Sequence, residues 1–142
     1  MRHALPLLVA ASLAGCAGST LGVDSRRVVG AVLDDAGSHH LRSLVAPDSA
    51  RAGVPFTVRV TTFGSSSCTR ADGAEVRVAG SVAEIVPFDR HAGGMRACTD
   101  DLASFPRDVA IRFDAAGPAT VRVRGAALNG TPSVLERTVV VR

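Results

Sequence analysis

The chain has 142 residues and a formal net charge of +3 at pH 7, and its basic residues other than histidine are all arginine. It contains five Phe but no Trp and no Tyr, so it lacks the aromatic side chains on which nucleic-acid-binding grooves stack bases, and we expect no nucleic-acid partner. The length suits a single domain, with a core built mainly from Val, Ile, Leu and Ala.

The first residues carry an export signal. A short basic start precedes an almost wholly apolar run, residues 4–13, and small residues follow in Leu13-Ala14-Gly15-Cys16. This order is typical of a secretory signal, and the apolar run is too short for a bilayer, which needs about 20 residues. The Leu13-Ala14-Gly15-Cys16 motif resembles the lipobox of bacterial lipoproteins. The resemblance implies cleavage before Cys16 and attachment of a diacylglycerol to its thiol; the alternative is an ordinary signal peptide with a chance cysteine.

The lipoprotein resemblance divides the chain into a signal peptide (residues 1–15), a lipidated cysteine with a flexible tether (residues 16–25) and a folded domain (residues 26–142). It implies an exported protein that is lipid-anchored to a bacterial membrane. Ala17, rather than Asp, follows the cysteine. By the same resemblance, this favours the outer membrane, at its periplasmic face or surface, in a cell that has two membranes.

Valine often alternates with polar residues in the rest of the chain, which is typical of strands with one buried and one exposed face. In residues 56–63, for example, Val58 and Val60 flank Arg59. We expect about seven or eight short strands, at residues 26–33, 41–47, 56–63, 74–79, 82–88, 107–113, 119–124 and 134–141.

The same alternation predicts which side chains are buried, because a slip of one residue would turn every side chain of a strand to the other face. Arg59 and Arg122 should then be exposed, and Val76 and Val78 should share a face opposite Glu75. The residues that we expect to be buried are Val58, Val60, Val109, Ile111, Val121 and Val123. Half-buried alternation predicts antiparallel pairing, and two such sheets packed face to face form a β-sandwich.

Two segments resemble bacterial immunoglobulin-like domains. Residues 52–60 (AGVPFTVRV) resemble the entry into the second strand of such domains, and residues 114–123 (DAAGPATVRV) resemble a hairpin late in them. The resemblance covers roughly residues 41–142 and implies an all-β, antiparallel immunoglobulin-like β-sandwich. The chain departs from antibody domains because it has no Trp to pack on an inter-sheet disulfide.

Two cysteines, Cys68 and Cys98, are left if Cys16 carries a lipid. An even number of cysteines in an exported chain predicts a disulfide. By closing the loop between Cys68 and Cys98, this disulfide would stabilise the folded state by about 3–4 kcal/mol. We expect it to fasten the loop 89–106 at one end of the sandwich. Its reduction should loosen that loop first and allow proteolysis near Arg90 or Arg96.

Metal binding is an alternative use of these residues. His91, Met95 and Cys98 lie close in the sequence, and Cys68 could join them in a copper site. The spacing does not match the cupredoxin pattern, and a second histidine would have to come from the pair at residues 39–40. A disulfide would also remove both thiolates. A calcium site would need Asp89 with Asp100 and Asp101, but these acids lack a repeating spacing.

Catalytic motifs are weak. The serines at residues 65–67 are not in a Gly-x-Ser-x-Gly elbow, although His91 and an Asp could be placed beside them. Glu75 and Glu84, the strand carboxylates, have nothing that marks a cleft. Arginines at outward positions could bind an acidic partner or could simply solubilise the strands; they are Arg59, Arg77, Arg112, Arg122 and Arg124.

The sequence therefore favours a non-catalytic, lipid-anchored module without a cofactor, which binds another envelope protein or a surface polymer. Two alternatives remain open. One is an envelope protein that handles copper or another metal through His91, Met95 and a free Cys98. The other is a small envelope hydrolase with Ser, His and a carboxylate in one pocket.

Overall fold

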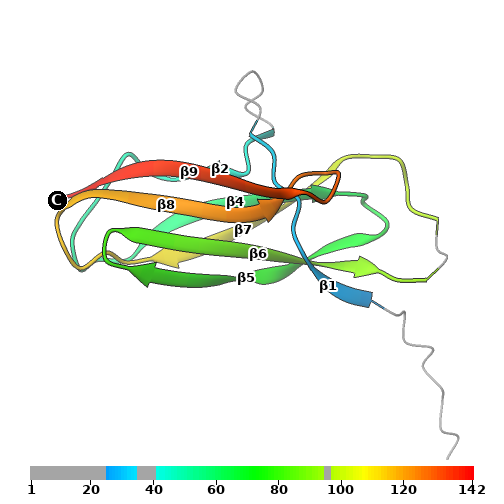
Figure 1. The fold of residues 1–142 in the computed structure, drawn as a ribbon, viewed down its shortest axis with the longest axis horizontal. Coiled ribbons are helices and arrows are strands. Elements are labelled where there is room, and N and C mark those ends of the chain that lie inside the picture. The colour runs from blue at the N-terminus through cyan, green and yellow to red at the C-terminus, as the bar shows by residue number, and fades with distance from the viewer. Residues whose placement is uncertain (1–24, 35–40, 95–96) are drawn as a thin grey trace, which may run out of the picture.

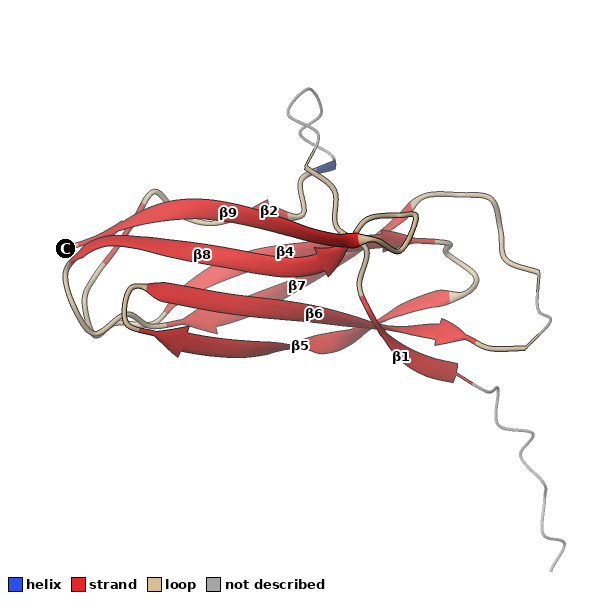
Figure 2. Ribbon diagram, viewed as in Figure 1, coloured by secondary structure: helices blue, strands red, loops and turns tan. Residues whose placement is uncertain are grey.

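The computed structural model describes residues 25–34, 41–94 and 97–142 (Figure 1). The signal peptide, most of the tether and Cys16 lie outside these residues. The described part folds into nine strands (Figure 2), and its helical content is limited to a 3-10 turn at Leu41. The strands are β1 (Ser25–Val29), β2 (Leu44–Val45), β3 (Ser49–Ala50), β4 (Phe56–Gly64), β5 (Thr69–Ala79), β6 (Val82–Ala92), β7 (Ala103–Ile111), β8 (Gly117–Ala126) and β9 (Pro132–Val141). No helix in this part is long and apolar enough to cross a membrane.

The described strands form two sheets that pack as a sandwich. One sheet has six strands, in the order β1-β6-β8-β9-β3 with β5 paired to β6, and the other has three, in the order β2-β4-β7. Because β5 pairs with β6 along nearly its whole length, β1 and β8 share the opposite edge of β6. On that edge, β8 pairs with the first part of β6 and β1 pairs with the last part of β6.

The all-β sandwich is confirmed, but the expectation of purely antiparallel sheets is wrong at two pairs. Strands β6 and β8 run parallel, as do β3 and β9. Between β6 and β8 the chain crosses to the other sheet as β7 and returns, so β8 starts at the same end as β6 (Figure 1). Alternation along a strand reports its buried face and carries no information about the direction of its neighbour.

The predicted core is confirmed. Val58, Val60, Val121 and Val123 are fully buried, and Val109 and Ile111 are buried with them. Arg59 is exposed, as expected, and the outward side chain of Arg122 is 34% exposed. Some bounds differ: the strand expected over residues 41–47 shrinks to β2, and the one expected over 74–79 begins earlier, at Thr69.

Directly after β1, the chain passes between the two sheets at one end of the sandwich. Gly30 donates its N–H to the carbonyl of Pro87 and accepts a hydrogen bond from the N–H of Ala126. Its backbone is so close to β4 and β6 that a Cβ would lie 2.3 Å from Thr62 Cγ2 and 2.8 Å from Asp89 Oδ2. Glycine is therefore needed at this position for close packing.

Candidate functional site

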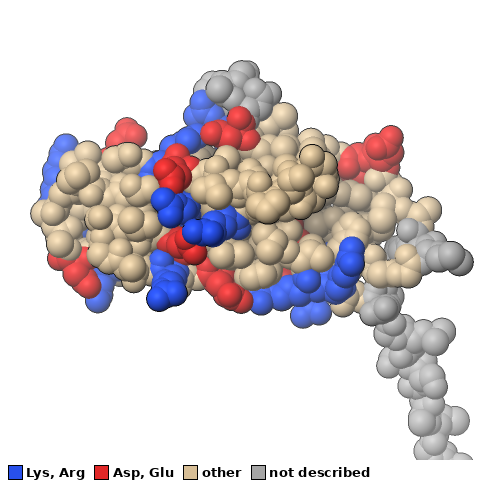
Figure 3. All heavy atoms as spheres, in the orientation of Figure 1, with Lys and Arg blue, Asp and Glu red and all other residues tan. Residues whose placement is uncertain are grey.

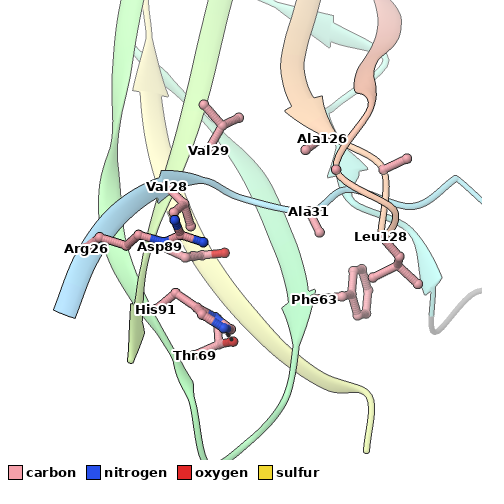
Figure 4. A pocket seen from close by; sticks show the side chains of 12 residues that line it. Arg26, Val28, Val29, Ala31, Phe63, Thr69, Asp89, His91, Ala126 and Leu128 are labelled. Atoms are coloured by element: carbon pink, nitrogen blue, oxygen red, sulfur yellow. Dashed lines mark hydrogen bonds between the residues drawn. The ribbon is translucent and has the colours of Figure 1, made fainter. Parts of the chain in front are cut away.

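A cavity of about 290 Å³ opens beside this crossing segment, close to the lower size limit of small-molecule sites. Strands β1, β4, β5 and β6 and the β8–β9 turn supply its walls (Figure 4). Phe63 and Leu128 form an apolar side on the right of the view, and polar groups form the other. The polar residues in the lining are Arg26, Thr69, Asp89 and His91.

A buried ion pair supports the floor of this cavity. Asp89 Oδ1 lies 2.6 Å from Arg107 Nη2, and the two side chains are only 2% and 9% exposed. Thr62 completes the group, because its hydroxyl donates to Asp89 Oδ1 at 2.9 Å and accepts a hydrogen bond from Arg107. A buried charge is tolerated only when it is paired and hydrogen-bonded, and here both conditions hold.

Arg107 also ties four strands together. Its guanidinium donates to the carbonyls of Gly73 on β5 (2.7 Å), Phe88 on β6 and Phe105 on its own strand β7 (3.3 Å), in addition to Thr62 on β4. The planar fork of arginine suits this many acceptors. Arg107 Nε is buried and has no hydrogen-bond partner within the described residues. The group is therefore a structural centre that fixes the carboxylate of Asp89 at the cavity.

His91 lies two residues after Asp89 on β6, so both side chains are on the same face of the strand. Its ring is beside Thr69, with Nδ1 3.4 Å from Thr69 Oγ1 (Figure 4). Asp89 instead hydrogen-bonds to Thr62 and Arg107. Asp89 and His91 thus have separate hydrogen-bond partners within the described residues.

The serines of residues 65–67 are not brought to His91. Ser65 Oγ lies 2.9 Å from Thr99 Oγ1, and Ser67 Oγ accepts a hydrogen bond from Thr99 N at 2.9 Å. Within the described residues His91 is not among the hydrogen-bond partners of these serines. The strand carboxylates are also separated, because Glu75 and Glu84 bind different arginines.

Cys68 and Cys98 form the predicted disulfide. Their Cα atoms are 5.6 Å apart, within the bridging range of about 7 Å. The bridge joins the start of β5 to the β6–β7 loop and occupies both sulfur atoms of the suggested copper site. Met95 and the histidines at residues 39–40 lie outside the described residues.

The acids suggested for calcium, Asp89, Asp100 and Asp101, do not form a metal site. Asp89 is in the buried ion pair, whereas Asp101 is exposed and accepts hydrogen bonds from the hydroxyl of Thr99 and from Ser66 N. These hydrogen bonds, that of Thr99 first, lower the pKa of Asp101 below its ordinary value. Among the described residues no three His, Cys, Asp or Glu side chains are grouped to hold a metal ion.

Most of the outward arginines singled out from the sequence form ion pairs with acids on their own or a neighbouring strand or turn. The pairs are Arg59 with Asp108 (2.8 Å), Arg112 with Asp114 (3.0 Å), Arg122 with Glu136 (2.6 Å) and Arg124 with Glu84 (2.6 Å). Acidic and basic side chains accordingly lie side by side on the face shown in Figure 3. Arg77 differs, because it is exposed and has no ion pair within the part of the chain that the structure describes.

The Arg59–Asp108 pair is the best formed of these surface pairs. Two nitrogens of the guanidinium donate to the two carboxylate oxygens, at 2.8 and 3.1 Å. The hydrogen bond from Arg59 lowers the pKa of Asp108, and the same hydrogen bond raises the pKa of Arg59. Exposed pairs of this kind add little stability, so their main effect is to balance charge on these strands.

Arg107 was not among the site residues predicted from the sequence, although the pattern of β7 contains a signal for it. Arg107 has the same parity as Val109 and Ile111 along β7, and Asp89 has the same parity as Ile85 along β6, so both charges occupy inward positions. Opposite charges at inward positions of two strands predict a buried ion pair. The cavity itself could not be found this way, because it depends on where the chain crosses between the sheets. No known protein-family model, curated protein or solved structure matches this chain.

Proposed function

We propose that the chain is an exported bacterial lipoprotein whose sandwich is a non-catalytic binding or structural module. In this proposal residues 1–15 are removed, Cys16 carries the lipid, and the domain acts at the cell envelope on another protein or a surface polymer. The cavity beside Asp89 and His91 is its candidate contact site.

The observation that carries the proposal is the use of the three cysteines. Cys68 and Cys98 form a disulfide, and disulfides persist mainly in exported proteins. The remaining cysteine, Cys16, is the one in the lipobox-like motif. Export thus accounts for both features together, since lipidation and disulfide formation require the same route out of the cytoplasm.

The immunoglobulin-like assignment is supported by the two packed sheets and by the first of the two segments that carried the resemblance. Residues 52–60 lead into β4. Residues 114–123 lead from β7 of the smaller sheet into β8 of the larger one, so they form a crossing between the sheets, and the expected hairpin is wrong. The parallel pairs β6–β8 and β3–β9 are departures, because the strands of such sandwiches are antiparallel. The assignment therefore concerns the general architecture, with a changed strand order in the larger sheet.

The sandwich has a clear polarity with respect to the proposed anchor. β1 begins at the end that holds the disulfide-linked loop, whereas the C-terminus and the β5–β6 turn lie at the opposite end (Figure 1). In this proposal the tether from the lipid on Cys16 enters the domain at the end that also holds the cavity.

Metabolic labelling with a palmitate analogue in a bacterial host tests the proposal. The native chain should take up label and lose residues 1–15, and Cys16→Ser should abolish both. The matched control is the double variant Cys68→Ser/Cys98→Ser, which removes the other thiols and should keep the label. Label that persists in Cys16→Ser, or that is absent from the native chain, contradicts the proposal.

Thiol titration separates the module from the copper-handling alternative. The oxidised, lipidated protein should have no reactive thiol, because its cysteines are in the disulfide or bear the lipid. A copper site through His91, Met95 and Cys98 requires a free Cys98 thiol in the native protein. Detection of that thiol would favour the metal alternative.

A further inference from the structure

Strand β5 has an unpaired edge along residues 74–79. Within the described residues β5 pairs with β6 alone, so its other edge presents backbone N–H and C=O groups to solvent. A bulge at Asp72 and Gly73, where Gly73 has φ 81°, interrupts the ladder at one end of this segment. The turn into β6 closes the other end. The segment between them is a regular edge of the kind that pairs with another chain.

The inner face of this edge is incompletely covered. Val76 and Val78 lie opposite Ile85 and Ala83 in the ladder, so all four side chains point toward the opposite sheet. Ile85 and Ala83 are fully buried, whereas Val76 and Val78 are 42% and 41% exposed. The three-stranded sheet therefore stops covering the larger sheet between β6 and β5.

Other strands in the described part also have unpaired edges, including β1 and most of β9, which pairs with β3 only at its last two residues. Strand β7, the edge of the smaller sheet, contains Pro106, which cannot donate to a ladder. The edge strands β2 and β3 have only two residues each. Residues 74–79 (AEVRVA) contain no Pro, and their two charged side chains are of opposite sign.

The sequence of the edge matches a second copy of itself. In an antiparallel pair centred on Val76, Glu75 lies opposite Arg77 of the second copy, and the same contact repeats by symmetry. Val76 then meets Val76 of the second copy on the inner face. A shift that centres the pair on Glu75 places two carboxylates directly opposite each other, and one that centres it on Arg77 places two guanidinium groups opposite each other. Like charges at this position destabilise the pair, so charge selects the Val76-centred register.

Glu75 and Arg77 on this edge can each form further ion pairs. Arg77 has no ion pair within the described residues, although Glu84 lies opposite it on β6, because Glu84 binds Arg124 instead. Glu75 binds Arg27 through Oε1, and its Oε2 has no hydrogen-bond partner within the described part of the chain.

We propose that two copies of this chain associate through their β5 edges, antiparallel about a two-fold axis at Val76, to form one continuous sheet. Such a contact is isologous and closes as a dimer. It does not depend on the lipid anchor, and it leaves the cavity at the end of the sandwich free for another ligand.

Cysteine cross-linking of the purified full chain in mild detergent tests the axis. In Val76→Cys the new cysteine meets its own copy, so catalysed oxidation should give a covalent dimer. Val134→Cys is the matched control, because Val134 is also an exposed strand valine (53%) but lies on β9. We expect a yield of covalent dimer at least tenfold higher for Val76→Cys than for Val134→Cys. The native chain shows how much cross-linking comes from Cys16, and this amount is subtracted from both.

A charge exchange tests the register by sedimentation equilibrium. Glu75→Arg and Arg77→Glu each create two like-charge pairs and should weaken association about tenfold. The double variant Glu75→Arg/Arg77→Glu restores opposite charges and should recover the native dimer affinity. Circular dichroism of each variant should match that of the native chain, since the substituted side chains are exposed.

Equal cross-linking of Val76→Cys and Val134→Cys would overturn the proposal, as would a native chain that remains monomeric at all concentrations. A double variant that stays as weak as the single variants would also overturn it. That last result would indicate that the edge pairs with a segment of a different protein, in which Glu75 and Arg77 do not face each other across a two-fold axis.

Discussion

Replacement of Arg107 by Met should destabilise the domain more than any exposed substitution, because it leaves the carboxylate of Asp89 buried without its counter-ion. Asp89 is 2% exposed, so its carboxylate has little contact with water to compensate for the lost guanidinium. Breaking a buried ion pair from one side costs about 3–5 kcal/mol, which is a large part of the roughly 5–15 kcal/mol that stabilises a typical domain.

The complementary variant, Asp89→Asn, should cost less. The guanidinium of Arg107 keeps three carbonyl acceptors and the hydroxyl of Thr62, so the loss is about 1.5–3 kcal/mol, typical of a hydrogen bond to a charged group. The double variant Asp89→Leu/Arg107→Met removes both charges. It should be more stable than the sum of the single losses predicts, with a coupling energy of about 2 kcal/mol or more.

Urea unfolding of the oxidised protein, followed by circular dichroism, measures these differences. Tryptophan fluorescence is not an option, because the chain contains no Trp. If Arg107→Met does not fold, the milder Asp89→Asn and the double variant still give a measurable comparison. A loss below about 1 kcal/mol for Arg107→Met, or strict additivity in the double variant, would refute the role given to the buried pair.

Three further predictions concern the same end of the sandwich. Gly30→Ala should lower stability by about 1–3 kcal/mol in urea unfolding, since its Cβ would lie 2.3 Å from Thr62 Cγ2; an unchanged midpoint would contradict the close packing. The loop expected over residues 89–106 is shorter in the structure, because β6 extends to Ala92 and β7 begins at Ala103. Reduction of the disulfide should cost about 3–4 kcal/mol and should increase tryptic cleavage of this β6–β7 loop, whereas equal cleavage before and after reduction would contradict the role of the bridge. The hydrogen bond from the hydroxyl of Thr99 lowers the pKa of Asp101 in the folded state. The ionised carboxylate therefore stabilises the folded protein at pH values above the unfolded pKa of 3.8. This stabilisation is lost as the pH falls through the folded pKa. Asp101→Asn should remove this pH dependence, and an NMR titration of the carboxyl carbon that gives an ordinary pKa would contradict it.

Much of the fold could be predicted because burial follows a period of two along the strands. The parity of Val58 and Val60 identified the buried face of β4, and the count of cysteines identified the Cys68–Cys98 pair. Strand direction could not be predicted, because the parallel β6–β8 pair results from the excursion of the chain through β7. The exposure of Val76 was equally hidden, since it depends on the width of the sheet on the other side of the core.

The candidate site was harder to predict than the fold. Asp89 appeared only as a weak calcium ligand, because the partner that neutralises it, Arg107, is distant in the sequence. The cavity depends on Gly30, whose close approach to Thr62 lets the chain pass between the sheets. Neither the crossing nor the cavity leaves a local pattern of residue types.

We propose above that this disulfide-bonded sandwich is exported and held at a membrane by a lipid on Cys16. Intact-mass spectrometry of the protein from the membrane fraction, before and after thiol alkylation, tests it most directly. We predict a chain that begins at Cys16, carries the mass of a diacylglyceryl group and takes up no alkylating reagent until it is reduced. A chain that begins at Met1, lacks the lipid and alkylates at Cys68 and Cys98 without reduction would contradict the claim.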